Sequence, residues 1–189
     1  MLAIIMSIAI AILLGAATWS LLEYVIHRWL GHDRRFRRNL FGIEHTRHHA
    51  EGGYFAASWK KALFTLGLIA VLTPPAWWAF GTVGAAYVLG VIGFYLSYEL
   101  SHRLEHVHPG LGPYGRWARR HHFTHHFVDP KRNFGVTSPI WDVVFGTYRK
   151  PGNAAGRIPV PRKLCMTWLL DPTTGAARRE FADVYDVLP

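Results

Sequence analysis

The sequence predicts an all-α fold: an integral-membrane helical domain of about three to four embedded helices, with a cytosolic helical cap that carries a histidine-rich di-metal site. Three observations predict it, namely long stretches without charge, an uneven distribution of basic residues, and histidines in regularly spaced groups. Residues counted as hydrophobic make up 50% of the 189 positions, so the chain can bury a large apolar area.

The first uncharged stretch runs from Met1 to Leu22. A bilayer core takes roughly 20 apolar helical residues to cross, so we expect one span at about residues 2–24. A signal peptide would carry a basic start and a small-residue cleavage site. Neither is convincing in this stretch, and we therefore expect the span to be retained.

The second uncharged stretch runs from Ala62 to Tyr98 and is too long for one crossing. A single helix through it would measure about 55 Å, against a bilayer core of about 30 Å. Pro74 and Pro75 lie near its middle and should break a helix. We predict a hairpin of two spans that turns between Pro74 and Gly84. The first covers about residues 60–73, or up to 80, and the second covers about 83–101.

The formal net charge of +9 is distributed unevenly along the chain. Basic residues are absent from the proposed turn and frequent between the first and second spans, which is the positive-inside pattern and not the mark of a nucleic-acid-binding protein. The pattern places the 25–61 segment and everything after His102, including the C-terminus, in the cytoplasm. All twelve histidines then lie on one side of the membrane. The single Cys165 excludes an intramolecular disulfide.

Ten of the histidines fall into four spaced groups. The spacing of three groups fits one face of a helix, because residues at i, i+3 and i+4 are neighbours there. The three members of each H-x2-H-H group can therefore converge. The four groups are His27 and His32; His45, His48 and His49; His102 and His106; and His122, His125 and His126.

His27 and His32 do not fit one α-helical face, because five residues rotate an α-helix by roughly 140°. We expect the helix to end near Gly31 in a left-handed cap, with His32 returning from a loop. The remaining histidines, His108 and His121, are expected to be solvated side chains.

Ten imidazoles exceed the ligand number of one ion, since zinc takes about four ligands and catalytic iron about five or six. The set therefore suits two metals. Neutral imidazole binds iron, zinc, copper and nickel, and no cysteine cluster points to structural zinc or an iron–sulfur cluster. A pair of redox irons beside a membrane suggests O2 activation. No catalytic residue beyond the metal ligands is predicted.

Two acidic residues are candidates to support the ligands, because metal-bound histidines usually donate their other N–H to a carboxylate or a carbonyl. Glu23 precedes His27 by four residues, and Glu99 precedes His102 by three. An acid at the end of a span is costly without a partner.

Two other classes of protein remain as alternatives. A hydrolase that uses a metal-bound water needs fewer histidines and usually has carboxylate ligands. A non-enzymatic metal-binding membrane protein or a metal transporter would place ionisable groups near mid-bilayer, whereas these histidines follow the ends of spans.

The four histidine groups, in this order, together with the segment from Asn133 to Tyr148, resemble the fatty acid hydroxylase / sterol desaturase superfamily of integral-membrane di-iron enzymes. The similarity covers roughly residues 20–150. It implies that the ten histidines hold two iron ions, with zinc as a possible substitute in purified protein. It also implies O2 as co-substrate and an external electron donor of the ferredoxin or cytochrome b5 type.

The resemblance implies hydroxylation of an aliphatic C–H in a membrane lipid, whether fatty acyl, sphingolipid, sterol or carotenoid, with desaturation at the same site as the alternative. No haem is expected, although His108-Pro109-Gly110 matches a haem-binding tripeptide, because a haem domain does not fit among these groups. We assign the oxygenase domain to residues 1–150 and a tail to residues 151–189. The Cys165–Leu170 patch of that tail is a candidate for membrane-surface contact.

Overall fold

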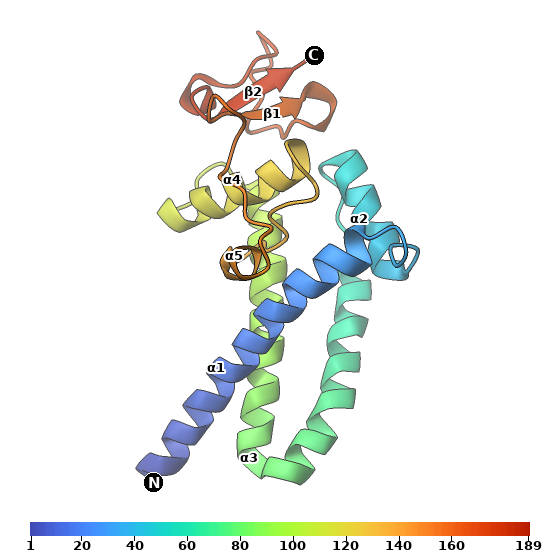
Figure 1. Ribbon diagram of the computed structural model, residues 1–189, viewed down its shortest axis with the longest axis vertical. Coiled ribbons are helices and arrows are strands. Elements are labelled where there is room, and N and C mark those ends of the chain that lie inside the picture. Colours follow the sequence, from blue (N-terminus) through green and yellow to red (C-terminus); the bar gives the residue numbers. More distant parts are fainter. The chain divides into compact units, whose positions relative to one another are not determined.

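The computed structural model describes residues 1–189. The chain forms two compact units, one of Met1–Glu23 with Ala56–Leu100 and one of Tyr24–Phe55 with Ser101–Pro189. The first unit is almost entirely helical, whereas the second combines helices with loops and two short strands (Figure 1). The elements are α1 (Leu2–Val25), a π-helix η1 (Ile26–His32), α2 (Leu40–Glu51), α3 (Ser58–Val107), α4 (Pro113–Phe127), α5 (Ile140–Val144), β1 (Ile158–Pro161), the 3₁₀ turns η2 (Arg162–Leu164) and η3 (Arg179–Phe181), and β2 (Tyr185–Leu188).

Two helices are long and apolar enough to cross a membrane by length and composition, Leu2–His32 and Ser58–Val107. Only 17% of the most apolar window of the first helix and 39% of that of the second is buried. Large apolar side chains such as Leu13, Trp78 and Phe80 are exposed. Apolar surface of this extent is unusual on a soluble protein, and a bilayer would cover it.

Helix α3 is a hairpin whose two limbs run side by side in Figure 1. The turn is at Gly81, whose φ of 56° and ψ of −132° only glycine adopts readily. The turn therefore falls inside the predicted interval from Pro74 to Gly84. The expectation that the two prolines break the helix was wrong, because Pro74 and Pro75 lie within the first limb.

Small residues bring α1 close to the second limb of α3. A Cβ added at Gly15 would lie 2.1 Å from the carbonyl oxygen of Tyr87, and one at Gly90 would meet the backbone of α1 equally closely. Such contacts between apolar helices depend on residues without side chains. Trp19 and Tyr95 pack beside them, with ring centroids 4.7 Å apart.

The second unit contains a two-stranded parallel sheet, so the prediction of an all-α fold was wrong for the C-terminal segment. Ile158 of β1 pairs with Tyr185 of β2. Their strands follow no long periodic pattern, and their pairing spans more than twenty intervening residues, so local sequence does not indicate it. The sheet packs with α4 around a buried cluster of Phe123, Ile158, Val160, Met166, Trp168, Leu169 and Tyr185.

The patch expected to contact a membrane surface contributes to this core. Met166, Trp168 and Leu169 are at most 8% exposed. Their apolar area is buried against the protein, and contact of this patch with a membrane surface stays a prediction.

Candidate metal centre

The ten grouped histidines come together in the second unit as two sets of five. In each set, one ring nitrogen per residue lies within 4.8 Å of those of the other four. The first histidine group is His27, His32, His45, His49 and His125, and the second histidine group is His48, His102, His106, His122 and His126. The two groups adjoin where the rings of His49 and His126 stack, with centroids 3.9 Å apart.

Both H-x2-H-H motifs are shared between the groups. Helix α2 directs His45 and His49 to the first group and His48 to the second. Helix α4 directs His125 to the first group and leaves its other two grouped histidines to the second. The expectation that the three members of a motif converge was therefore wrong. Residues at i and i+4 stay together, and the residue between them faces the neighbouring group.

The π-helix η1 explains how His27 and His32 meet. A π-helix closes i→i+5 hydrogen bonds, so residues five apart return to the same face. The Nε2 atoms of His27 and His32 are 3.3 Å apart. The predicted left-handed cap at Gly31 was wrong, because Gly31 lies inside η1 and the helix ends at His32. Gly31 instead makes room, since a Cβ there would lie 2.9 Å from the ring of His45.

Burial favours the neutral form of eight of the ten grouped imidazoles by lowering their pKa. Desolvation, followed by neighbouring imidazoles, holds the pKa of His45, His122 and His126 well below the usual value of 6.5. The pKa of His125 is lowered in the same way, although a hydrogen bond to the Arg132 carbonyl opposes the shift. Neutral imidazole is the form that binds metal ions.

Backbone carbonyls orient three of the rings. Nδ1 of His27 donates to the carbonyl of Phe134 at 2.5 Å, and Nδ1 of His48 donates to Tyr54 at 2.6 Å. Nδ1 of His125 donates to the carbonyl of Arg132 at 2.7 Å. A ring that donates through Nδ1 keeps the Nε2 lone pair free for a metal.

The donor set fits a cation in each group. Nε2 atoms of His32 and His45 are 2.8 Å apart, and those of His106 and His122 are 3.0 Å apart. Two imidazoles bound to one metal at about 2.1 Å and about 90° would place their nitrogens about 3.0 Å apart. His126 buries both ring nitrogens without a hydrogen-bond partner, which costs about 1–3 kcal/mol unless a cation binds one of them.

The supporting role of the two acidic candidates stays a prediction. Glu99 pairs with Lys61 of the opposite limb of α3. Glu23 is only 4% exposed. The supports whose bonds to ring nitrogens are resolved are the carbonyls described above. A backbone carbonyl has no sequence signature, so residue types alone do not indicate it.

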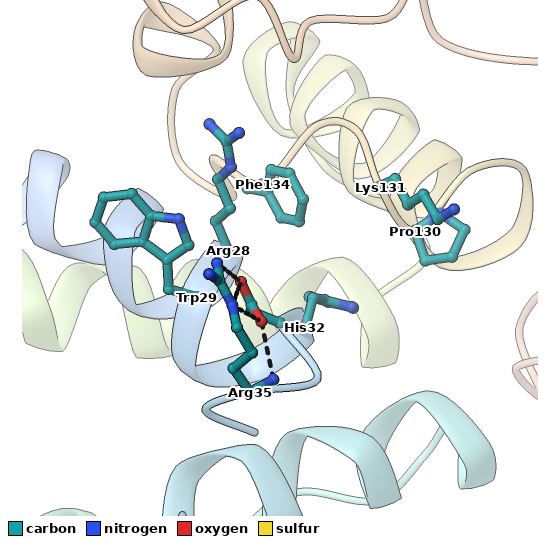
Figure 2. Close-up of a pocket in the computed structure, with 8 residues that line it drawn as sticks. Arg28, Trp29, His32, Arg35, Pro130, Lys131 and Phe134 are labelled. Carbon is teal, nitrogen blue, oxygen red and sulfur yellow. Dashed lines mark hydrogen bonds and ion pairs between the residues drawn. The ribbon is translucent and has the colours of Figure 1, made fainter. Parts of the chain in front are cut away.

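An open cavity of about 310 Å³ lies beside the first histidine group, and His32 lines it (Figure 2). Its walls come from two segments, η1 with the turn after it, and the loop after α4. The side chains are mainly cationic and aromatic. The lining residues are Arg28, Trp29, His32, Asp33, Arg35, Pro130, Lys131 and Phe134.

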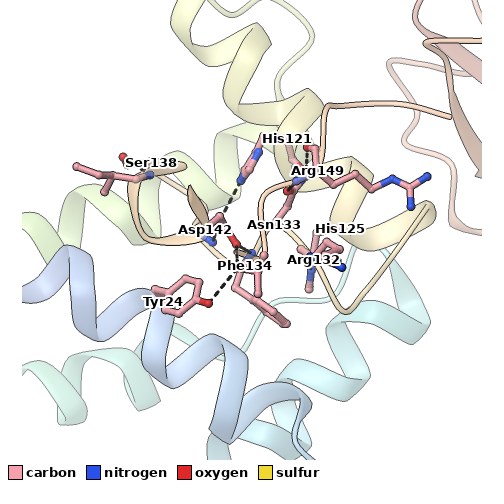
Figure 3. A network of polar contacts seen from close by, with 12 residues as sticks. Tyr24, His121, His125, Arg132, Asn133, Phe134, Ser138, Asp142 and Arg149 are labelled. Carbon is pink, nitrogen blue, oxygen red and sulfur yellow. Dashed lines mark hydrogen bonds and ion pairs between the residues drawn. The ribbon is translucent and has the colours of Figure 1, made fainter. Parts of the chain in front are cut away.

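A buried network around Asp142 shapes the loop that supports the first group (Figure 3). The Asp142 carboxylate accepts the backbone N–H groups of Phe134 and Gly135, each at 2.8 Å. It also accepts the Thr147 hydroxyl at 2.7 Å and faces Nε2 of His121 at 3.3 Å. His121, expected to be solvated, is fully buried here, whereas His108 is exposed as expected. Neither belongs to a histidine group.

The C-terminal segment supports the second group. Nε1 of Trp168 donates to the carbonyl of His106 at 2.7 Å. Buried Arg119 stacks on Trp168, with its guanidinium carbon 4.2 Å from the ring centroid. Arg119 also donates to the carbonyl of Glu105 at 2.8 Å and to that of His108. These bonds satisfy carbonyls at the C-terminal end of α3, which would otherwise lack helical partners.

Two groups of five histidines, each able to hold a metal ion, in a chain with long apolar helices define the class as a mainly helical protein with a histidine-rich candidate site. The model of the fatty acid hydroxylase family matches residues 12–147 of this chain. The chain belongs to this family, and the resemblance drawn from the histidine spacing is confirmed.

Relatives and a solved structure agree with this assignment. The chain is 30% identical over 159 residues to the ceramide very long chain fatty acid hydroxylase scs7 of Schizosaccharomyces pombe, covering 80% of this chain and 46% of the relative. It is 32% identical over 148 residues to human fatty acid 2-hydroxylase, covering 71% and 38%. A structure titled full-length scs7p, with only its hydroxylase domain visible, has a TM-score of 0.58 at 29% identity and covers 77% and 58%. The chain thus spans about half the length of these relatives or less.

Proposed function

We propose that this protein is an O2-dependent di-iron hydroxylase that oxidises C2 of the acyl chain of a membrane lipid. Family membership supports hydroxylation, and the similarity to human fatty acid 2-hydroxylase supports the C2 position. The two histidine groups are the observation that carries the proposal, because a family match alone would not require a competent site.

The ten histidines are the proposed metal ligands, five for each ion. Bound iron would supply the activation of O2 and the oxidation of the C–H bond. In the balanced reaction one oxygen atom enters the C–H bond and the other leaves as water, with two electrons and two protons supplied by a donor. We propose a separate redox protein of the ferredoxin or cytochrome b5 type as that donor, with zinc as a substitute metal in purified protein.

The chain's own residues place and protect this site. The carbonyls of Phe134, Tyr54 and Arg132 fix the tautomers of three ligand rings. The ring of Phe134 lies 5.6 Å from that of His32 and 5.5 Å from that of His125, so it limits water at the first group. Burial of the imidazoles keeps them ready to bind metal at neutral pH.

We also propose an integral membrane protein with three spans, α1 and the two limbs of α3, and with the histidines and C-terminus in the cytoplasm. The outward-facing apolar side chains of both helices support the membrane location. The basic residues that follow α1 support the orientation. The oxygenase domain is assigned to residues 1–150, and the tail of residues 151–189 is assigned a supporting role through Trp168.

Metal analysis combined with lipid mass spectrometry tests the proposal. Wild-type protein should retain two irons, or iron and zinc, per chain, and cells expressing it should accumulate lipids with one added oxygen at C2. His125→Ala removes a ligand of the first group and His48→Ala one of the second. Each should lower metal content and abolish the product. His108→Ala is the matched control, because His108 is exposed and outside both groups.

The outcomes separate the alternatives. A hydroxylated product that persists in both His48→Ala and His125→Ala would remove the di-metal assignment. A product lacking two hydrogens, with no added oxygen, would indicate a desaturase at the same site. Metal flux into vesicles without lipid oxidation would indicate a transporter.

A further inference from the structure

We propose that the cavity beside His32 binds the polar end of the acyl substrate, and that Arg28 and Lys131 select a substrate whose polar end is anionic, a carboxylate or a phosphate. The inference rests on the proposed C2 hydroxylation. It names a binding site and a substrate class that the histidine groups alone do not specify.

The charges of the cavity leave two cations without a carboxylate partner. Asp33 is the only acid in the lining, and its carboxylate pairs with Arg35 at 2.7 Å. Arg28 donates to the neutral hydroxyl of Tyr24 at 2.7 Å, and no ion pair neutralises Lys131. The lining therefore holds more cationic than anionic side chains, and Figure 2 shows Arg28 and Lys131 on its two separate segments.

The position of the cavity suits oxidation next to a polar group. C2 is bonded to the carbonyl carbon, so a lipid oxidised at C2 must hold its polar end within a few ångströms of the metals. His32, in the cavity wall, has its Nε2 2.9 Å from that of His125 and 2.8 Å from that of His45. A carboxylate bound in this cavity would therefore lie beside the first histidine group.

Aromatic side chains supply the apolar part of the wall. Phe134 is 4% exposed and Trp29 is 45% exposed. Arg28 lies over the ring of Phe134, with its guanidinium carbon 5.9 Å from the centroid. The aromatic rings can contact the first methylenes of an acyl chain while the cations bind its end. This combination matches a lipid better than a free inorganic anion.

Equilibrium binding to the detergent-solubilised full chain at pH 8 tests the inference. A fluorescent palmitate analogue is displaced by palmitate, by its neutral isostere palmitamide, or by palmitoyl lysophosphatidate. We expect an anionic competitor to bind about tenfold more tightly than palmitamide, since hydrogen bonds to charged groups are the stronger kind. Lys131→Gln and Arg28→Gln should abolish the preference. Lys150→Gln, an exposed cation outside the cavity, should preserve it.

The outcomes show which anionic group the cavity binds, and they test this inference and the proposed function separately. Preference for palmitate assigns the cavity to a carboxylate, and preference for the lysophosphatidate assigns it to a phosphate end. Equal binding of palmitamide, or a preference unchanged in Lys131→Gln, overturns the inference. C2-hydroxylated product is measured on the same preparations. Anion preference without any product would count against the proposed function alone, whereas product without anion preference would count against this inference alone.

Discussion

At the scale of single residues, the carboxylate of Asp142 supports the first histidine group indirectly, because it contacts none of the histidines in that group. It accepts a hydrogen bond from the N–H of Phe134, and the carbonyl of Phe134 accepts one from the ring of His27. Asp142→Asn replaces an acceptor oxygen with an N–H2 group that faces other donors. We expect it to destabilise the fold by about 2–4 kcal/mol, because it breaks a buried charged network.

The same substitution should weaken metal binding at the first histidine group about 10–100-fold, as loss of an outer partner usually does. Metal content per chain after desalting should fall from two towards one, and thermal unfolding should report the stability loss. Asp183→Asn, at an exposed position, is the control. Two retained metals in a destabilised Asp142→Asn protein would show that the network serves folding only.

The sequence predicts which histidines come together far better than it predicts the groups that support them, and the reason is physical. The spacing of His45, His48 and His49 along a helix brings all three to the candidate site, although it does not indicate that His48 joins the second histidine group. Asp142 and Trp168 act through backbone groups of distant segments, which only the tertiary structure brings into contact. The resemblance over Asn133–Tyr148 includes Asp142 but does not state its role.

At the scale of elements, the π-helix η1 sets the geometry of the first group, and Gly31 lets α2 approach it. Gly31→Ala would place a methyl group 2.9 Å from the ring of His45, so the ring must move. We expect about tenfold or greater loss of metal affinity at the first group, with little change in helix content by circular dichroism. Gly53→Ala is the matched control, because a Cβ at Gly53 meets nothing within 4 Å. Equal metal content in the two variants would contradict this account.

Other elements show where local rules succeed and where they fail. The length of the uncharged stretch predicts the two limbs of α3. A proline can remain in a membrane helix when neighbouring groups compensate the lost hydrogen bond, so Pro74 and Pro75 do not make the turn. The turn lies at Gly81 instead. The i→i+5 geometry of η1 was missed because an α-helix is the default for the same residues. The pairing of β1 with β2 depends on contacts distant in sequence.

At the scale of the whole molecule, a residue beyond the family match supports the second histidine group. Trp168 lies after residue 147, where the match ends, yet it binds the carbonyl of His106. Trp168→Phe keeps most of the buried ring and removes the N–H donor. We expect a loss of about 1 kcal/mol in stability and a lower metal content at the second group. Trp59→Phe, at a side chain 63% exposed, should change neither, and a Trp168→Phe protein with full metal content would contradict the assignment.

The sharing of α2 and α4 between the two histidine groups has a consequence for biosynthesis. Each group draws on ligands that precede α3 and on ligands of α4 that follow it. A growing chain therefore has neither group complete until α4 has left the ribosome, however early its first helices form. If the groups bind metal as proposed, the first could be filled only after synthesis of His125 and the second only after synthesis of His126, and a chain truncated before α4 would carry two incomplete groups.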